Sequence, residues 1–170
     1  MITKCILIYA LLVNNFGYGI ADEVIDITDC DNYIPETCYQ YATLLVEHFD
    51  EKNIETAVRV MWCESRNKAD AYRWQDQDSG LFQTIPRTWG WVKEEHDIPY
   101  WDYIPYWDYP VGNIYAQFIP RYNIQVAALL VQDMHTRDDY WKPWSSSQWC
   151  WEDTDKWIVK WKNEATGNNQ

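Results

Sequence analysis

Apolar residues recur at helical spacing through the middle of the chain. The clearest run places them three and four positions apart, at Ile54, Ala57, Val58, Met61 and Trp62. This pattern predicts an amphipathic helix that ends near Ser65. A similar pattern predicts an earlier helix from Pro35 to about Phe49, with Pro35 and Glu36 in its first turn. The polar connection at residues 50–53 is short, so we expect the two helices to pack as an antiparallel pair.

Two further helices follow in the sequence. Residues 84–92 suit a helix with Pro86 in the first turn and Trp89 facing inward. A longer helix is expected from Asn123 to about His135, on an apolar stripe made of Ile124, Ala127, Ala128, Val131 and Met134. We expect this helix to pack in the core against the helix that ends at Ser65. Asn123 suits a helix cap or a contact with substrate.

Two stretches lack helical periodicity. Residues 66–79 are polar and predict a loop before the chain turns at Gly80. Residues 98–103 read Ile-Pro-Tyr-Trp-Asp-Tyr and are repeated without change at 104–109. Proline at every sixth position excludes a helix, so we expect an extended aromatic loop. Its aromatic faces suit either stacking on sugar rings or a neutral surface flap.

The two ends of the chain have their own composition. Residues 1–21 resemble a secretory signal, with Lys4 before an apolar run and Gly19-Ile20-Ala21 as a cleavage site. The apolar run is too short to span a membrane. After it we expect an acidic lead-in at 22–34, one domain at 35–163 with an aromatic insertion at 95–120, and a disordered tail at 164–170. The mature protein is therefore expected to be secreted.

The net charge of the chain limits the classes of molecule that it is expected to bind. The chain has 14 Lys and Arg against 26 Asp and Glu, a formal net charge of −12. Loss of Lys4 with the signal would make it −13. This balance argues against a nucleic-acid partner, since phosphates require clustered cations. The three histidines have no spacing that would bind zinc, so no metal and no cofactor are expected.

Glu64 is the leading candidate for chemistry. It stands at the end of a predicted helix, beside Trp62 and other apolar residues. Partial desolvation there should raise the pKa of its carboxyl and keep it protonated near neutral pH. Cleavage of a glycosidic bond requires such a general acid. The alternative is an ordinary solvated carboxylate at a helix end.

The residues around Glu64 resemble a known family. Glu64-Ser65, Ala71, Ser79-Gly80-Leu81-Phe82-Gln83, Pro86 and Thr88-Trp89 are similar to the catalytic segment of the lysozyme-like superfamily. The likeness is to its branch of soluble lytic transglycosylases, goose-type lysozymes and resuscitation-promoting-factor-like muramidases. Asn123-Ile124, Ala127-Ala128 and Trp141-Lys142-Pro143-Trp144 resemble that branch's closing helix and paired tryptophans. The resemblance implies an α+β fold, mainly α, with a small hairpin beside a sugar cleft.

The resemblance also implies a set of site residues. Glu64 would be the acid, and the second carboxylate, where one is used, would be Asp76 or Asp78. These two aspartates suit a solvated turn equally well, and their spacing does not match a calcium loop. The residues expected to bind substrate are Ser79, Gln83, Trp89, Asn123, Tyr140 and Trp144.

Cysteine usage agrees with secretion. Cys5 would leave with the signal, and four cysteines would remain, which allow three disulfide connectivities. We favour Cys30–Cys38, which closes a short loop, and Cys63–Cys150. The second pair follows the resemblance, because relatives with a cysteine before the catalytic glutamate use it in this way.

Three functions are compatible with these observations. The first is a monomeric secreted lysozyme or lytic transglycosylase that cleaves the β-1,4 bonds of peptidoglycan with Glu64 as acid. Basic residues help wall-lytic enzymes to approach anionic walls, so the acidic charge suits an acidic or salty medium, or soluble wall fragments. The second is the same chemistry on chitin or a related glycan. The third is a non-catalytic glycan-binding protein that uses the 12 Trp and 13 Tyr as stacking surfaces.

Overall fold

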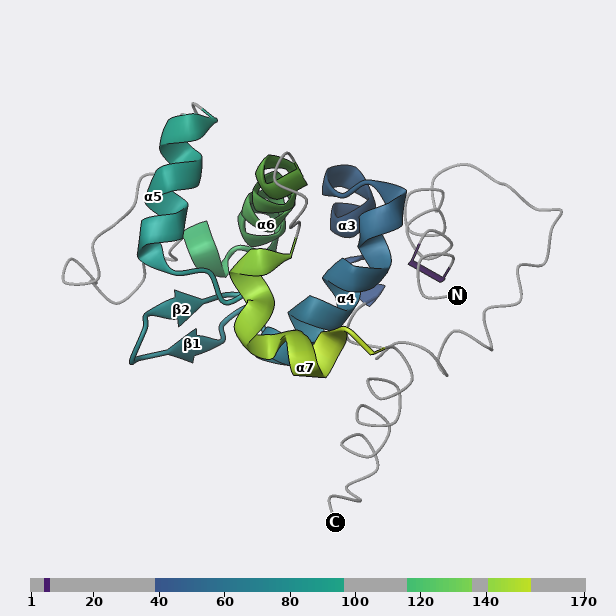
Figure 1. The fold of residues 1–170 in the computed structure, drawn as a ribbon, viewed down its shortest axis with the longest axis horizontal. Coiled ribbons are helices and arrows are strands. Elements are labelled where there is room, and N and C mark those ends of the chain that lie inside the picture. Colours follow the sequence, from purple (N-terminus) through teal and green to yellow (C-terminus); the bar gives the residue numbers. More distant parts are fainter. Residues whose placement is uncertain (1–4, 7–38, 97–115, 136–140, 154–170) are drawn as a thin grey trace, which may run out of the picture. The chain divides into compact units, whose positions relative to one another are not determined.

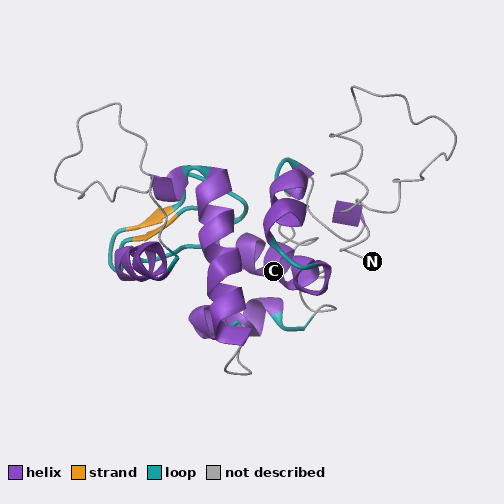
Figure 2. Cartoon of the chain, turned by 90° about the horizontal axis from the view of Figure 1, so that it is seen from above, coloured by secondary structure: helices purple, strands orange, loops and turns teal. Residues whose placement is uncertain are grey.

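The computed structural model describes residues 5–6, 39–96, 116–135 and 141–153 (Figure 1). This part of the chain is mainly helical and has one small two-stranded sheet, drawn in orange in Figure 2. The predicted class, α+β and mainly α, is confirmed. The chain divides into two compact units, residues 1–63 with 146–170 and residues 64–145.

The first unit contains helix α3 (Ala42–His48), most of helix α4 (Glu51–Ser65) and helix α7 (Gln148–Trp151). Helix α3 is shorter than the helix predicted to start at Pro35, because a turn occupies residues 40–41; residues 35–38 lie outside the described part. Helix α4 starts earlier than expected. The Asn53 amide donates to the Asp50 carbonyl over 2.8 Å in its first turn, and Glu51 places a negative charge at the positive end of the helix dipole.

Helix α4 confirms the hydrophobic pattern that predicted it. All five residues of the predicted stripe are at most 4 % exposed. Val60 and Ser65 are buried as well, so the apolar surface of the helix extends beyond one stripe. A helix covered this widely is held by packing more than by intrinsic propensity.

Two links tie the chain after residue 146 to helix α4. Cys63 and Cys150 form a disulfide, as predicted, with Cα atoms 6.1 Å apart. The Arg59 side chain donates from Nη1 to the Glu152 carbonyl oxygen over 3.2 Å. Cys5 is buried and disulfide-bonded. The predicted pair Cys30–Cys38 lies outside the described residues.

The second unit holds the hairpin, formed by strands β1 (Tyr72–Arg73) and β2 (Asp78–Ser79). The strands are antiparallel, with Tyr72 opposite Ser79 and Arg73 opposite Asp78. The small hairpin expected after Glu64 is therefore present. This unit also contains the helices α5 (Pro86–Glu95), η3 (Ala116–Phe118), α6 (Pro120–His135) and η4 (Lys142–Ser147). The last two residues of η4 belong to the first unit.

Prolines mark where two of these helices begin. Pro86 lies in the first turn of α5, as predicted, and Trp89 is 5 % exposed. Helix α6 begins at Pro120, three residues before the predicted start, since proline needs no amide partner in a first turn. Helices α5 and α6 are joined by His96 Nε2 and Asp133 Oδ2, which are 2.9 Å apart. The duplicated loop at 98–109, Tyr140 and the predicted tail at 164–170 lie outside the described residues.

Candidate active site

Glu64 is the second-last residue of helix α4 and is half-buried. Its neighbours Trp62 and Ser65 are buried, and Cys63 is held in the disulfide. The glutamate therefore stands at a helix end whose flanking residues are packed or covalently fixed. A carboxyl at such a position combines a defined place with partial access to solvent, as proton donation to a ligand requires.

The backbone changes direction directly after Ser65. Arg66 and Asn67 have φ of 55° and 61°, in the left-handed region that non-glycine residues seldom adopt. In the described part of the chain, every non-glycine residue with positive φ lies between residues 66 and 83; the others are Gln77 and Gln83. Such conformations cost free energy and gather at functional sites. The segment that follows Glu64 is thus the most strained described backbone.

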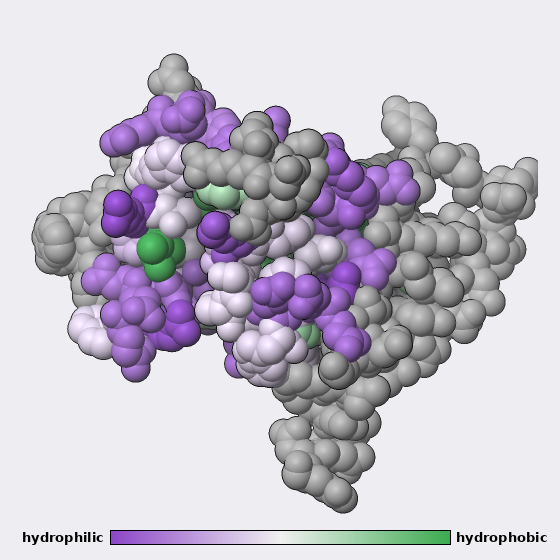
Figure 3. Space-filling model, viewed as in Figure 1, coloured by the Kyte–Doolittle hydropathy of each residue, from purple (hydrophilic) through white to green (hydrophobic). Residues whose placement is uncertain are grey.

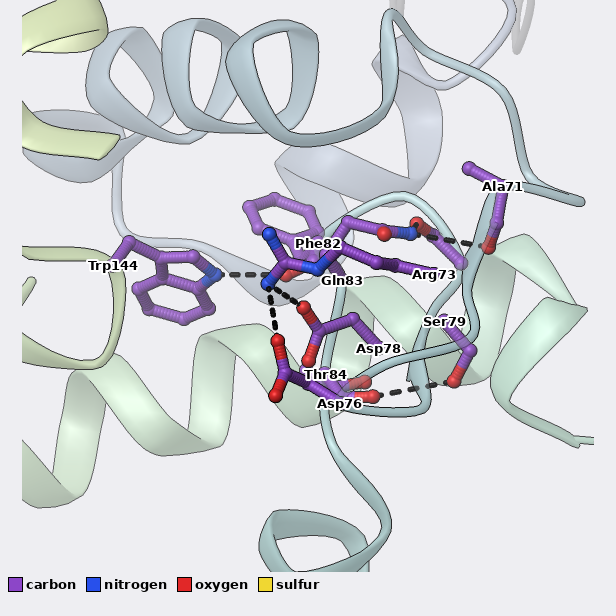
Figure 4. A network of polar contacts seen from close by, with 10 residues as sticks. Ala71, Arg73, Asp76, Asp78, Ser79, Phe82, Gln83, Thr84 and Trp144 are labelled. Atoms are coloured by element: carbon purple, nitrogen blue, oxygen red, sulfur yellow. Dashed lines mark hydrogen bonds and ion pairs between the residues drawn. The ribbon is translucent and has the colours of Figure 1, made fainter. Parts of the chain in front are cut away.

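The hairpin brings both candidate second carboxylates to one guanidinium. The Asp78 side chain is 5 % exposed and forms an ion pair with Arg73, whose side chain is 57 % exposed. Asp76 Oδ2 lies 3.5 Å from Nη2 of the same arginine and belongs to an exposed side chain (Figure 4). Burial raises the pKa of the Asp78 carboxyl above its ordinary value, while the hydrogen bond and the charge of Arg73 act in the opposite direction.

Residues 79–84 form a tight loop closed by its own backbone. The Ser79 amide donates to the Thr84 carbonyl over 3.2 Å, and the Thr84 amide returns a bond of 3.1 Å to Ser79. The Ser79 hydroxyl also donates to the Thr84 carbonyl, over 3.2 Å, and Ser79 is fully buried. Ser79, expected to bind substrate, therefore closes this loop, since its hydroxyl is directed into the backbone.

Gly80 is required at its position for two reasons. Its φ of 76° lies in the left-handed region, where a side chain is strained. A Cβ built on it would also lie 2.2 Å from the Gln117 carbonyl oxygen and 2.3 Å from Asn123 Nδ2. The loop backbone can approach helix α6 this closely only because residue 80 has no side chain.

The side chain of Asn123, in helix α6, forms hydrogen bonds with the backbone of the loop. Its side chain is fully buried; Oδ1 accepts the Phe82 amide over 2.8 Å, and Nδ2 donates to the carbonyl oxygens of Ser79 (3.1 Å) and Gln117 (2.9 Å). Asn123 lies inside α6 and not at its start. The expected helix cap is therefore wrong. The buried amide is occupied by these hydrogen bonds and supports the loop, and its contact with substrate stays a prediction.

Trp144, which lies near the last residue of the second unit, supports the same loop. Its indole Nε1 donates to the Phe82 carbonyl oxygen over 2.8 Å, and the two rings pack edge to face with centroids 5.7 Å apart (Figure 4). Trp144 is 3 % exposed. The indole therefore packs against Phe82, and Trp89 is likewise buried. The expected contact of these two residues with sugar stays a prediction.

Gln83 is the half-buried member of the loop. Its Nε2 donates to the carbonyl oxygens of Ala71 (3.1 Å) and Gly80 (2.8 Å), so the side chain links the loop to the chain that enters the hairpin. Figure 4 shows this amide directed towards Ala71. Gln83 combines a strained backbone, with φ of 48°, and a side chain fixed by two hydrogen bonds. Among the residues expected to bind substrate, it is the described one that is not buried.

Sequence reasoning missed the aromatic surface of the hairpin. Trp74 is 65 % exposed, and its neighbour Tyr72 contacts both Trp74 and Phe118 edge to face. The available signal was a tryptophan within a polar stretch, Arg73 to Asp78. That signal did not predict whether the Trp74 side chain is exposed. The pairing of the two strands places Trp74 in the exposed turn at residues 74–77.

Within residues 5–6, 39–96, 116–135 and 141–153, no group of three or more His, Cys, Asp or Glu side chains is placed to hold a metal ion. A search of the same residues finds no helix that is long and apolar enough to cross a membrane. Comparison with models of protein families, with curated protein sequences and with solved structures finds no match.

Proposed function

We propose that the protein is a secreted glycosidase that cleaves β-1,4 bonds of peptidoglycan, with Glu64 as the general acid. The observation that carries the proposal is the arrangement directly after Glu64, where the described non-glycine residues with positive φ are all found. The residues of this segment also resemble the catalytic segment of the lysozyme-like superfamily. Strained backbone conformations persist only where surrounding contacts hold them, and they are found often in active sites.

Glu64 would donate its proton to the oxygen of the glycosidic bond as that bond breaks. The glycosyl carbon would then bond either to water, which gives hydrolysis, or to a hydroxyl oxygen of the substrate itself, which gives a cyclic product. The proton of the attacking group would pass to a base, which in the second case would be the Glu64 carboxylate. Of the two hairpin aspartates, Asp76 suits the base that hydrolysis requires, since Asp78 is buried against Arg73. In transglycosylation neither aspartate would be needed.

The loop Gly80–Gln83 would form the floor on which the sugar chain is positioned. Its support by Asn123 and Trp144 fixes the backbone before any ligand arrives. Preorganisation of this kind reduces the entropy lost when a substrate is oriented for reaction. The disulfide Cys63–Cys150 and the signal-like residues 1–21 support a location outside the cell.

A decisive test replaces the acid with its neutral isostere. Glu64→Gln should lower the rate of turbidity loss in a bacterial wall suspension by about 10²–10⁴-fold, the usual worth of a general acid. Glu51→Gln is the matched control, since Glu51 is exposed at the opposite end of the same helix. Equal rates for the Glu64 variant and the parent would refute the assignment.

A non-catalytic glycan-binding protein is the second candidate, and the exposed Trp74 favours it. Binding to insoluble peptidoglycan would then persist in Glu64→Gln and in the parent alike, with no soluble fragments released by either. Mass spectrometry of the soluble fraction separates the two candidates. It also distinguishes hydrolysed ends from cyclic ends if cleavage occurs.

A further inference from the structure

The hairpin turn exposes a large aromatic residue. Trp74 is 65 % exposed and lies in the turn that directly follows strand β1. Exposed aromatic surface is unfavourable in water, and it commonly marks a contact site. In Figure 3 strongly hydrophobic residues form only small separate spots on a mostly polar described surface. The described residues of that face show no broad apolar area of the kind that a stable protein interface uses.

Neighbouring rings hold the indole in place. The Tyr72 and Trp74 ring centroids are 6.2 Å apart with an interplanar angle of 76°. Tyr72 meets Phe118 of helix η3 in a similar way, at 6.2 Å and 68°. These edge-to-face contacts connect the hairpin turn to a second segment of the same unit. We call Tyr72, Trp74 and Phe118 the aromatic platform.

Polar side chains lie beside Trp74 in the hairpin turn, and the arginine of the hairpin is already paired. Gln75, Asp76 and Gln77 are exposed beside Trp74 and can form hydrogen bonds with hydroxyl and amide groups. The cation of the hairpin, Arg73, is engaged by Asp76 and Asp78. The chain as a whole has a formal charge of −12. Phosphates and other anions are therefore disfavoured as ligands of this site, because they would meet two carboxylates and an arginine that is already paired. We expect a neutral ligand.

We propose that the aromatic platform binds a neutral N-acetylhexosamine ring of a glycan chain. The apolar face of such a ring packs on an indole, and its hydroxyl and acetamido groups match the amides and the carboxylate beside Trp74. The proposal deepens the proposed function, because the platform would be a sugar site of the same protein. Binding at the platform does not depend on proton donation by Glu64, so the two ideas fail separately.

The test measures binding of tetra-N-acetylchitotetraose, a neutral oligosaccharide, by isothermal titration to the full chain carrying Glu64→Gln. Adding Trp74→Ala should weaken binding about tenfold, in line with the worth of a single aromatic stacking contact. Adding Trp149→Ala is the matched control, since Trp149 is 73 % exposed and lies in the other unit. It should change the affinity less than twofold. Raising the salt concentration should have little effect on binding of a neutral ligand.

Three outcomes would overturn the proposal: no binding of the oligosaccharide by the parent, unchanged affinity in Trp74→Ala, or an equal loss in Trp149→Ala. Circular dichroism establishes that each variant is folded. Should Trp74→Ala fail to fold, the Trp74 indole N–H signal in the unsubstituted chain, assigned with Trp74→Phe, must shift on titration. Loss of cleavage in Glu64→Gln with intact binding would support both ideas. Absence of cleavage in the parent with intact binding would retain the platform alone.

Discussion

The supported loop Gly80–Gln83 and the hairpin turn at 74–77 stand at opposite extremes within one unit. The loop is held by a buried asparagine and a buried tryptophan that belong to segments distant in sequence. All residues of the turn are exposed. The turn is held by two pairs of facing residues between strands β1 and β2 and by the contact of Trp74 with the Tyr72 ring. The comparison teaches that rigid support and exposed contact surface are supplied by separate residues. Substitutions in the loop should change stability, and those in the turn should change binding.

The largest contrast is expected between two tryptophans. Trp144→Ala should lower the free energy of unfolding by about 4 kcal/mol, because it leaves a cavity beneath Phe82 and removes a buried hydrogen bond. Trp74→Ala should change it by less than about 0.5 kcal/mol, as expected for an exposed residue. Urea denaturation followed by circular dichroism measures both. Similar losses in the two variants would remove the distinction between loop and turn.

A pair of glycines provides the next contrast. Gly80→Ala should cost about 3 kcal/mol, since the new methyl group meets backbone oxygen and strains a left-handed residue. Gly90→Ala is its control: no atom beyond its chain neighbours and the backbone of its own helix lies within 4 Å of the new Cβ, and the residue is inside helix α5. There alanine should stabilise the protein by about 0.5–1 kcal/mol. The same denaturation measurement decides, and a stable Gly80→Ala would contradict the close approach to helix α6.

Asn123 should have a smaller effect, which is local to the loop. Asn123→Ala leaves the buried Phe82 amide without its acceptor and should cost about 2 kcal/mol. Amide hydrogen exchange at Phe82 should accelerate in the same variant. Gln132→Ala, an exposed position on helix α6, is the control and should leave this exchange rate as it is. Slow exchange in Asn123→Ala would show that another group protects the amide.

The smallest effect concerns pH and the hairpin charges. Because burial raises the pKa of Asp78, its contribution to stability is fully present below the ordinary value of 3.8 and is lost as pH rises through the raised value. Arg73→Gln removes the opposing charge, so the pKa should rise further and the loss of stability should grow, by less than about 1 kcal/mol. Urea midpoints over roughly pH 3 to pH 8 measure the change.

Two controls isolate this effect. Arg87→Gln removes an exposed arginine from helix α5 and should leave the pH profile unchanged. Adding Asp78→Asn to Arg73→Gln should abolish the extra pH dependence, since no carboxyl then remains to titrate at position 78. A profile that persists in the double variant would assign the effect to another group.

Local pattern determined much of the fold. The 3.6-residue period of apolar positions predicted α4, α5 and α6, and Pro86 marked the start of α5. The polar stretch after Glu64 resembled a family segment that contains a hairpin, and a hairpin is present. The pairing Cys63–Cys150 was also anticipated, from the same resemblance. The helices and the hairpin depend on residues close together in the sequence. The disulfide concerns cysteine, of which the chain has few.

Only the tertiary structure decided what the polar and aromatic residues do. Ser79, Asn123 and Trp144 were expected to contact sugar, yet they are buried beneath or within one loop. Trp74 was not singled out, yet it is among the most exposed large residues described. The reason is physical: whether an amide or an indole faces solvent depends on partners such as Phe82, 41 residues from Asn123 and 62 from Trp144. Sequence periodicity reports which face of a helix is apolar, and it carries no record of such distant partners.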